Sequence, residues 1–239
     1  MDISINILIF SLIAGLVTGL GAIISVLIKN PTNKIISLAL GFASGIMIGV
    51  SLLSLIPHSI SLGDIEFTAI GFIIGGIFMW FIDSFIPHFD KGKENKNIYL
   101  KMGYFIAIGI AIHNLPEGIA IGASSAVSEQ LGIFTAGAIG IHNIAEGMAV
   151  ALPLCLGKIT KRKIIFITTM TGLSTFFGTI IGVLLVSISP LFIASSMAFA
   201  AGAMLYIASD ELIPHSHNTH VEFANIGIMV GITISFLLP

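Results

Sequence analysis

The longest stretch without a charged side chain restricts this chain more than any other feature. Residues 164–209 contain no Asp, Glu, Lys or Arg, and a helix needs about 20 apolar residues to cross the hydrocarbon core of a bilayer. These 46 residues suit two crossings, with a turn at 187–190 because proline favours an extended residue before it. Charged residues make up only 9% of the chain, against about 25% in soluble domains, so the chain needs lipid as its solvent.

Hydrophobic runs predict an all-α, polytopic membrane protein that forms a single domain over residues 1–239. We place eight membrane-spanning helices at about 4–28, 36–56, 66–87, 103–123, 131–154, 164–188, 190–209 and 222–238. The first run is too long and wrongly flanked for a secretory signal, so it is predicted to be a retained span. No basic stripe that would bind nucleic acid is present. The single cysteine, Cys155, excludes an intrachain disulfide and a metal site built from cysteines.

Basic residues predict how the chain is oriented. All ten Lys and Arg fall in three connections, which follow the first, third and fifth predicted spans: Lys29 and Lys34; Lys91, Lys93, Lys96 and Lys101; Lys158, Lys161, Arg162 and Lys163. With eight spans these connections share one side of the membrane, and the positive-inside rule makes that side cytoplasmic. Both termini are then predicted to be extracytoplasmic.

Two copies of one polar motif lie near the centres of two neighbouring spans. The second copy follows the first by 29 residues: His113-Asn114-Leu115-Pro116-Glu117-Gly118 and His142-Asn143-Ile144-Ala145-Glu146-Gly147. Residues four apart share a helix face, so each histidine can meet its own glutamate on one ion. Ionisable groups at mid-membrane cost about 3 kcal/mol each. A bound cation would compensate this cost.

The ligand types narrow the choice of cation. Imidazole nitrogen with carboxylate oxygen suits zinc, ferrous iron, manganese and nickel, and the lack of a thiolate argues against copper(I). Pro116 removes a backbone donor and frees a carbonyl near His113. The alternative interpretation is that the motifs are hydrogen-bonded pairs that hold the two spans together.

Other polar residues are open to two interpretations each. Met47 is either a soft sulfur ligand or a filler of apolar space. Asp83, Asp210 and Glu211 either form an exit path or anchor helix ends among headgroups. A histidine cluster is expected in the loop before the last span, either as a loose metal-binding tract or as a solvated turn: His215, His217 and His220. Two single histidines, His58 and His88, are expected in loops without a metal role.

The paired motif resembles that of the ZIP (Zrt-, Irt-like protein) family of metal transporters. Two further segments are similar to the second and seventh helices of that family: 41–47 with Ser51 and Pro57, and 201–204 with 210–214. The resemblance is closest to the compact bacterial members. It implies a multi-pass protein of the plasma (inner) membrane with eight helices, both termini outside and frequent dimerisation. It also implies uptake of zinc or related ions (iron, manganese, cadmium) into the cytoplasm, by alternating access in which one helix bundle slides against another.

The resemblance also implies which residues bind the transported ion, with no separate cofactor. A metal pathway between the second, fourth, fifth and seventh helices would hold a principal site of Met47, His113, Glu117 and Glu146. Asn114 and Asn143 match an adjoining site. His142, from the motif spacing, and Glu211, from the exit path, complete the predicted metal ligands. In two places the chain departs from many members: Ala145 replaces a proline, and Thr175 replaces a glutamate that can complete the second site.

Two other functions use the same ligands. A membrane-embedded zinc hydrolase would need a general base, but the His-Glu-x-x-His pattern that supplies one is absent. We therefore predict that the chain is not an enzyme. A metal exporter fits the residues equally well, because a sequence does not set the direction of flux by itself.

Overall fold

Helices account for every regular element in the computed structural model, which describes residues 4–28, 32–85, 96–185 and 190–237. The order is α1 (Ile5–Leu16), α2 (Thr18–Leu27), α3 (Asn33–Val50), η1 (Ser51–Leu55), α4 (Ile56–Leu62), α5 (Ile65–Phe85), α6 (Lys96–Val127), α7 (Glu129–Leu156), α8 (Lys161–Leu185), α9 (Pro190–Ile207), η2 (Ala208–Leu212) and α10 (Ile213–Ser235). The segments η1 and η2 are π-helical turns. Lys29, Lys91, Lys93, His88 and the predicted turn at 187–189 lie outside the described residues.

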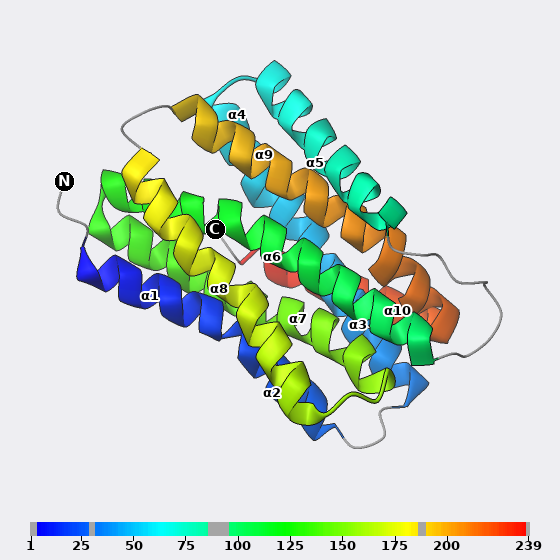
Figure 1. Ribbon diagram of the computed structural model, residues 1–239. Helices are drawn as coiled ribbons and strands as arrows, with labels where there is room; N and C mark the ends of the chain where they lie inside the picture. The colour runs from blue at the N-terminus through cyan, green and yellow to red at the C-terminus, as the bar shows by residue number, and fades with distance from the viewer. Residues whose placement is uncertain (1–3, 29–31, 86–95, 186–189, 238–239) are drawn as a thin grey trace.

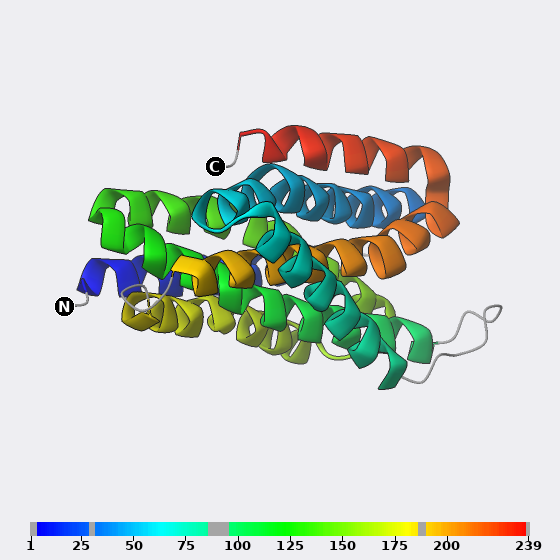
Figure 2. The same cartoon turned by 90° about the horizontal axis from the view of Figure 1, so that it is seen from above.

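Seven helical stretches of the described chain are long and apolar enough to cross a membrane: Ile5–Leu27, Asn33–Leu62, Ile65–Ser84, Tyr99–Ala126, Glu129–Leu156, Lys161–Leu184 and Pro190–Ser235. The last has 46 residues, or about 69 Å at 1.5 Å per residue, roughly twice the thickness of the hydrocarbon core. It does not run straight. The backbone of His220 is non-helical, with φ −166° and ψ 103°, and α10 returns antiparallel to α9 (Figure 2).

Glycines bring the helices together as two groups (Figure 1). In the first, a Cβ on Gly118 of α6 would collide with the Thr175 carbonyl of α8, and one on Gly147 of α7 with the Thr18 carbonyl of α2. We call α1, α2, α6, α7 and α8 the site group. In the second group, a Cβ on Gly45 of α3 would collide with the Ile228 carbonyl of α10. Gly71 and Gly75 of α5 lie in the same way against α9, and we call α3, α4, α5, α9 and α10 the second group.

Glycines four residues apart also lie at the interfaces of α3 and α5. Gly41 and Gly45 contact the backbone of α10, and Gly71 and Gly75 contact the backbone of α9. Small residues of this kind allow two helix backbones to approach closely, which is how helices associate where no hydrophobic effect drives them together. Close backbone contacts therefore join the helices of the site group, and they join two pairs in the second group, α3 with α10 and α5 with α9.

Burial differs sharply between the outer and inner helices. In the most apolar 18-residue stretch of each helix, only 22% is buried for α5, against 78% for α6 and 72% for α7. Ile73, Ile77 and Trp80 of α5 are all more than half exposed. An apolar surface this exposed matches a lipid environment. The two helices that carry the polar motifs therefore lie in the interior of the protein.

Two predicted boundaries were wrong in detail. The second predicted span ended at residue 56, but the helix continues through η1 and α4 to Leu62, so His58 is helical and not a loop residue. The last predicted span began at 222, but α10 begins at Ile213 and contains His215 and His217. Proline explains both errors: Pro57 and Pro214 occupy the first turns of α4 and α10, where a missing N–H is tolerated.

Candidate metal site

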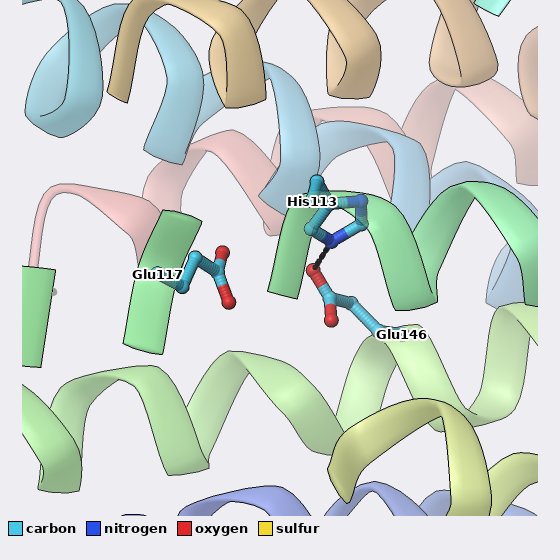
Figure 3. Close-up of side chains that lie close together, drawn as sticks. All are labelled: His113, Glu117 and Glu146. Carbon is cyan, nitrogen blue, oxygen red and sulfur yellow. Dashed lines mark hydrogen bonds and ion pairs between the residues drawn. The ribbon is translucent and has the colours of Figure 1, made fainter. Parts of the chain in front are cut away.

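The two histidines and two glutamates of the repeated motif form two reciprocal pairs between α6 and α7. His113 Nε2 lies 2.8 Å from Glu146 Oε1, and His142 Nε2 lies 3.0 Å from Glu117 Oε1. All four side chains are at most 3% exposed. Figure 3 shows His113 and Glu117 projecting from α6 toward Glu146 of α7. Ligand atoms of these three residues lie within 4.8 Å of one another, so a single cation can contact them all.

This pairing differs from the one that the spacing predicted. The sequence pairs each histidine with the glutamate four residues later in its own helix. In the structure the short contacts cross between helices, and the contact of His142 with Glu146 within α7 is 4.0 Å. One four-residue cluster thus replaces two separate sites. Helix spacing places side chains on a face, but it does not say which helix that face meets.

Polar atoms around the pairs add to the ligand set. The terminal amide atom of Asn114 that faces the cluster lies 3.2 Å from Glu146 Oε2, and 3.3 Å from both Glu117 Oε2 and His113 Nε2. As nitrogen it donates hydrogen bonds to the carboxylates, and as oxygen it offers a cation another ligand. Nδ1 of His113 is buried and has no hydrogen-bond partner within the described chain. Buried polar atoms are normally paired, so this nitrogen fits a site that receives a ligand.

Close packing fixes the positions of these side chains. Gly118 follows Glu117 directly and lies against the α8 backbone, while Gly147 follows Glu146 and lies against α2. Any larger residue at these two positions would move the adjacent glutamate. Pro116 lies inside α6, where it leaves the Ile112 carbonyl without its usual helical donor.

The other predicted ligands lie in different surroundings. Met47 is fully buried on α3, in the same apolar cluster as Val50, and its role as a sulfur ligand stays a prediction. Asn143 Nδ2 donates to the Ala14 carbonyl over 2.9 Å. Asn143 therefore connects α7 to α1, and its buried Oδ1 has no partner among the described residues. A role for Asn143 in an adjoining site also stays a prediction.

Glu211 belongs to a second acidic cluster at the junction of α9, η2 and α10. Ligand atoms of Asp83, Asp210 and Glu211 lie within 4.8 Å of one another, and the Tyr206 hydroxyl donates to Asp83 Oδ2 over 3.3 Å. His215 Nδ1 lies 3.4 Å from Glu211 Oε2. Carboxylates on two helices of the second group thus meet, as an exit path would require, but clusters of this kind also occur without a metal.

The geometry agrees with the comparison to known proteins. The profile of the family described as "ZIP Zinc transporter" matches residues 3–101 and 93–239. The chain belongs to the ZIP zinc transporter family. It is 36% identical to the "Zinc transporter ZupT" of Chlorobium limicola, over 95% of both chains. The ZupT of Oceanobacillus iheyensis is 34% identical over 98% of this chain and 97% of its own. That of Escherichia fergusonii is 35% identical, over 87% and 85%.

Membership of the ZIP family establishes the class of activity. The chain is a transporter of divalent metal and not an enzyme, it needs no cofactor for that activity, and its apolar helices make it a multi-pass membrane protein. The sequence predicted metal transport from the paired motif, the membrane helices from the hydrophobic runs, and the lack of enzyme activity from the missing His-Glu-x-x-His pattern. Helix spacing alone missed the reciprocal arrangement, whereas the principal site that the resemblance implied already joined His113 and Glu117 with Glu146.

Two positions depart from the family pattern. Thr175 of α8 is fully buried, and its hydroxyl has no hydrogen-bond partner in the described part of the chain. Its carbonyl packs on Gly118, so the residue lies beside the helix that carries Glu117. A threonine cannot supply the carboxylate that many members have here. Ala145, the second departure, is buried within an uninterrupted stretch of α7.

Proposed function

We propose that this protein takes up zinc into the cytoplasm by alternating access, and that His113, Glu117, His142 and Glu146 bind the ion in transit. Ferrous iron, manganese and cadmium are proposed as further substrates, because imidazole nitrogen and carboxylate oxygen suit all of them. The observation that carries the proposal is the reciprocal pairing of two histidines with two glutamates between α6 and α7. The Nε2–Oε1 distances are 2.8 and 3.0 Å, and the four side chains are buried inside the helix bundle.

The electrostatics of the pairs favour a mobile cation over a purely structural role. A buried ion pair is weak evidence for stability, because desolvation offsets most of the attraction. Two such pairs buried between α6 and α7 would therefore add little stability to helices that already pack closely through glycines. Zinc binding needs neutral imidazole and ionised carboxylate. A cation that enters the cluster thus takes over the carboxylate oxygens and releases the protons that the pairs share.

The packing supports movement of the site group past the second group. Among the described glycines, Gly109 of α6 is the one whose added Cβ would meet the opposite group, and there it would meet the flexible ends of Ile207 and Met79. Every other described glycine whose added Cβ would meet a backbone atom meets one in its own group. Two groups that meet in this way can slide or rock against each other, which would expose His113 and Glu117 to each side of the membrane in turn.

The proposed direction and orientation rest on charge and chain path. The ends of α2, α5 and α7, after which basic residues follow, gather at one end of the bundle, and the first turn of α1 and the last turn of α10 lie toward the other (Figures 1 and 2). Termini at one end require an even number of crossings, which supports eight once Pro190–Ser235 counts as two. By the positive-inside rule the basic end is cytoplasmic. We place the protein in the plasma (inner) membrane, with Glu211 on the cytoplasmic exit path and a homodimer as the assembled form.

Uptake by reconstituted protein tests the proposal directly. Proteoliposomes that hold the full chain should accumulate zinc from outside, and His113→Ala should remove most of that uptake. Competition by ferrous iron, manganese and cadmium would rank the substrates. Growth of a zinc-starved strain separates import from export, because an exporter would worsen starvation. Unchanged flux in His113→Ala would refute the role of that residue.

A further inference from the structure

One cavity leads from the buried pairs toward the end of the bundle that lacks basic residues. It has a volume of about 70 Å³ and contains Glu117 and His142 at its inner end. Ser54, Ser124 and Thr135 line it further out and are half-buried, and the exposed His58 also lines it. Polarity thus continues from the surface to the metal site, and the space holds a few waters, each of about 30 Å³.

The ring of His58 is held in one tautomer by its own helix. His58 Nδ1 lies 2.9 Å from the Ser54 carbonyl, four residues earlier. A carbonyl oxygen can only accept a hydrogen bond, so Nδ1 carries the proton and Nε2 of the neutral ring keeps its lone pair. Histidines that bind metals commonly have this arrangement, in which the second nitrogen donates to a carbonyl and fixes the ring. His58 is therefore prepared to bind a cation through Nε2.

The helix that carries His58 is itself fixed in place. The next residue, Ser59, is fully buried and donates to the Ala194 carbonyl of α9 over 2.8 Å. Its oxygen also lies 2.8 Å from the Thr68 hydroxyl of α5. Since the Ser59 proton is used on Ala194, Thr68 donates to Ser59. These bonds tie α4 to the second group and hold His58 over the cavity.

The same five residues recur at the opposite end of the bundle. Residues 55–59 and 212–216 both read Leu-Ile-Pro-His-Ser, and each begins on the last residue of a π-helical turn, η1 or η2. In the second copy His215 Nδ1 also lies 2.9 Å from the carbonyl four residues earlier, that of Glu211. The local sequence thus builds the same oriented imidazole at each end. In the second copy that imidazole lies beside an acidic cluster.

We propose that His58 is a capture ligand: its Nε2 binds the divalent cation at the mouth of the cavity, before the ion passes to Glu117 and His142. The proposal rests on the transport function inferred above. The hydroxyls of Ser124 and Thr135 lie along the way and can replace waters of the ion as it moves inward. Capture at the mouth raises the local zinc concentration next to the buried pairs without altering them.

Initial rates of zinc uptake into proteoliposomes test this role. His58→Ala should raise the half-saturating zinc concentration at least about fivefold and leave the maximal rate within about twofold, because it removes binding but not the transport step. Ser61→Ala, on the same short helix, is the matched control and should behave like wild type. His58→Cys should restore part of the lost affinity, since a thiolate also binds zinc.

A second measurement does not depend on transport. In a Cys155→Ser background, the His58→Cys thiol should react with a membrane-impermeant maleimide, and zinc but not magnesium should slow that reaction. The proposal is overturned if wild-type liposomes take up zinc and His58→Ala has unchanged half-saturation, or if Cys rescues no better than Ala. Failure of wild-type protein to transport zinc would instead remove the proposed function itself.

Discussion

Two close helix interfaces in this protein are built from different side chains: glycines form the one between α3 and α10, and ionisable residues form the one between α6 and α7. Between α3 and α10, Gly41 and Gly45 lie against the backbone of Ala224 and Ile228. Between α6 and α7, the facing positions hold four ionisable side chains at hydrogen-bonding distance. The first interface is complete without any ligand, because its contacts are van der Waals contacts between backbones. The second places two histidines and two glutamates in the interior, where a cation changes the electrostatic balance.

The comparison predicts that charge at the α6–α7 interface controls function more than stability. Glu146→Gln keeps the shape of the side chain and removes its charge. Loss of a charge-assisted contact is worth up to about 3 kcal/mol, which corresponds to about a hundredfold in binding. Zinc uptake by Glu146→Gln should therefore fall about a hundredfold, whereas the purified variant should elute as wild type does in size-exclusion chromatography.

Glu129→Gln is the matched control for this prediction. Glu129 lies in the first turn of the same helix and accepts hydrogen bonds from Ser4 and Asn6 near the surface. Its uptake should stay within about twofold of wild type, because an exposed polar contact contributes little. Equal losses in the two variants would mean that uptake depends on the general charge of α7 and not on the buried pairs.

A substitution at the glycine interface between α3 and α10 should instead lower stability and leave zinc binding intact. A Cβ on Gly45 would collide with the Ile228 carbonyl, and overpacking typically costs about 1–3 kcal/mol. Gly45→Ala should lower the melting temperature of the protein in detergent by several degrees, while any folded fraction still binds zinc. Gly137→Ala is the control, because a Cβ there would meet no atom within 4 Å. Equal melting temperatures for the two variants would show that α3 and α10 separate at little cost.

Much of this contrast could be predicted from the sequence, and the rest depends on how the helices are arranged. The placement of the motifs on two neighbouring spans follows from composition and helical period, and α6 and α7 carry them as expected. The cross-pairing of His113 with Glu146 does not, because a helical period fixes a face and not its neighbour. His58 was expected in a loop, since Pro57 resembles a terminator. A π-helical turn before that proline lets the helix continue.

The smallest effect that we expect is the pH dependence of zinc binding at the α6–α7 interface. Zinc binds ionised carboxylate and neutral imidazole, so at low pH protons compete for Glu117, Glu146 and the two histidines. Lowering the pH from 7.5 to 6.5 should raise the half-saturating zinc concentration by at most about tenfold for each proton displaced.

Zinc should also raise the melting temperature less at the lower pH, because stabilisation by a ligand follows its occupancy. Gly45→Ala should lower the melting temperature at both values and keep the zinc-dependent shift, whereas Glu146→Gln should lose that shift. A zinc shift that stays the same at both pH values would mean that protons do not compete for the cluster, and the ligands would then have to be sought elsewhere than in the four paired side chains.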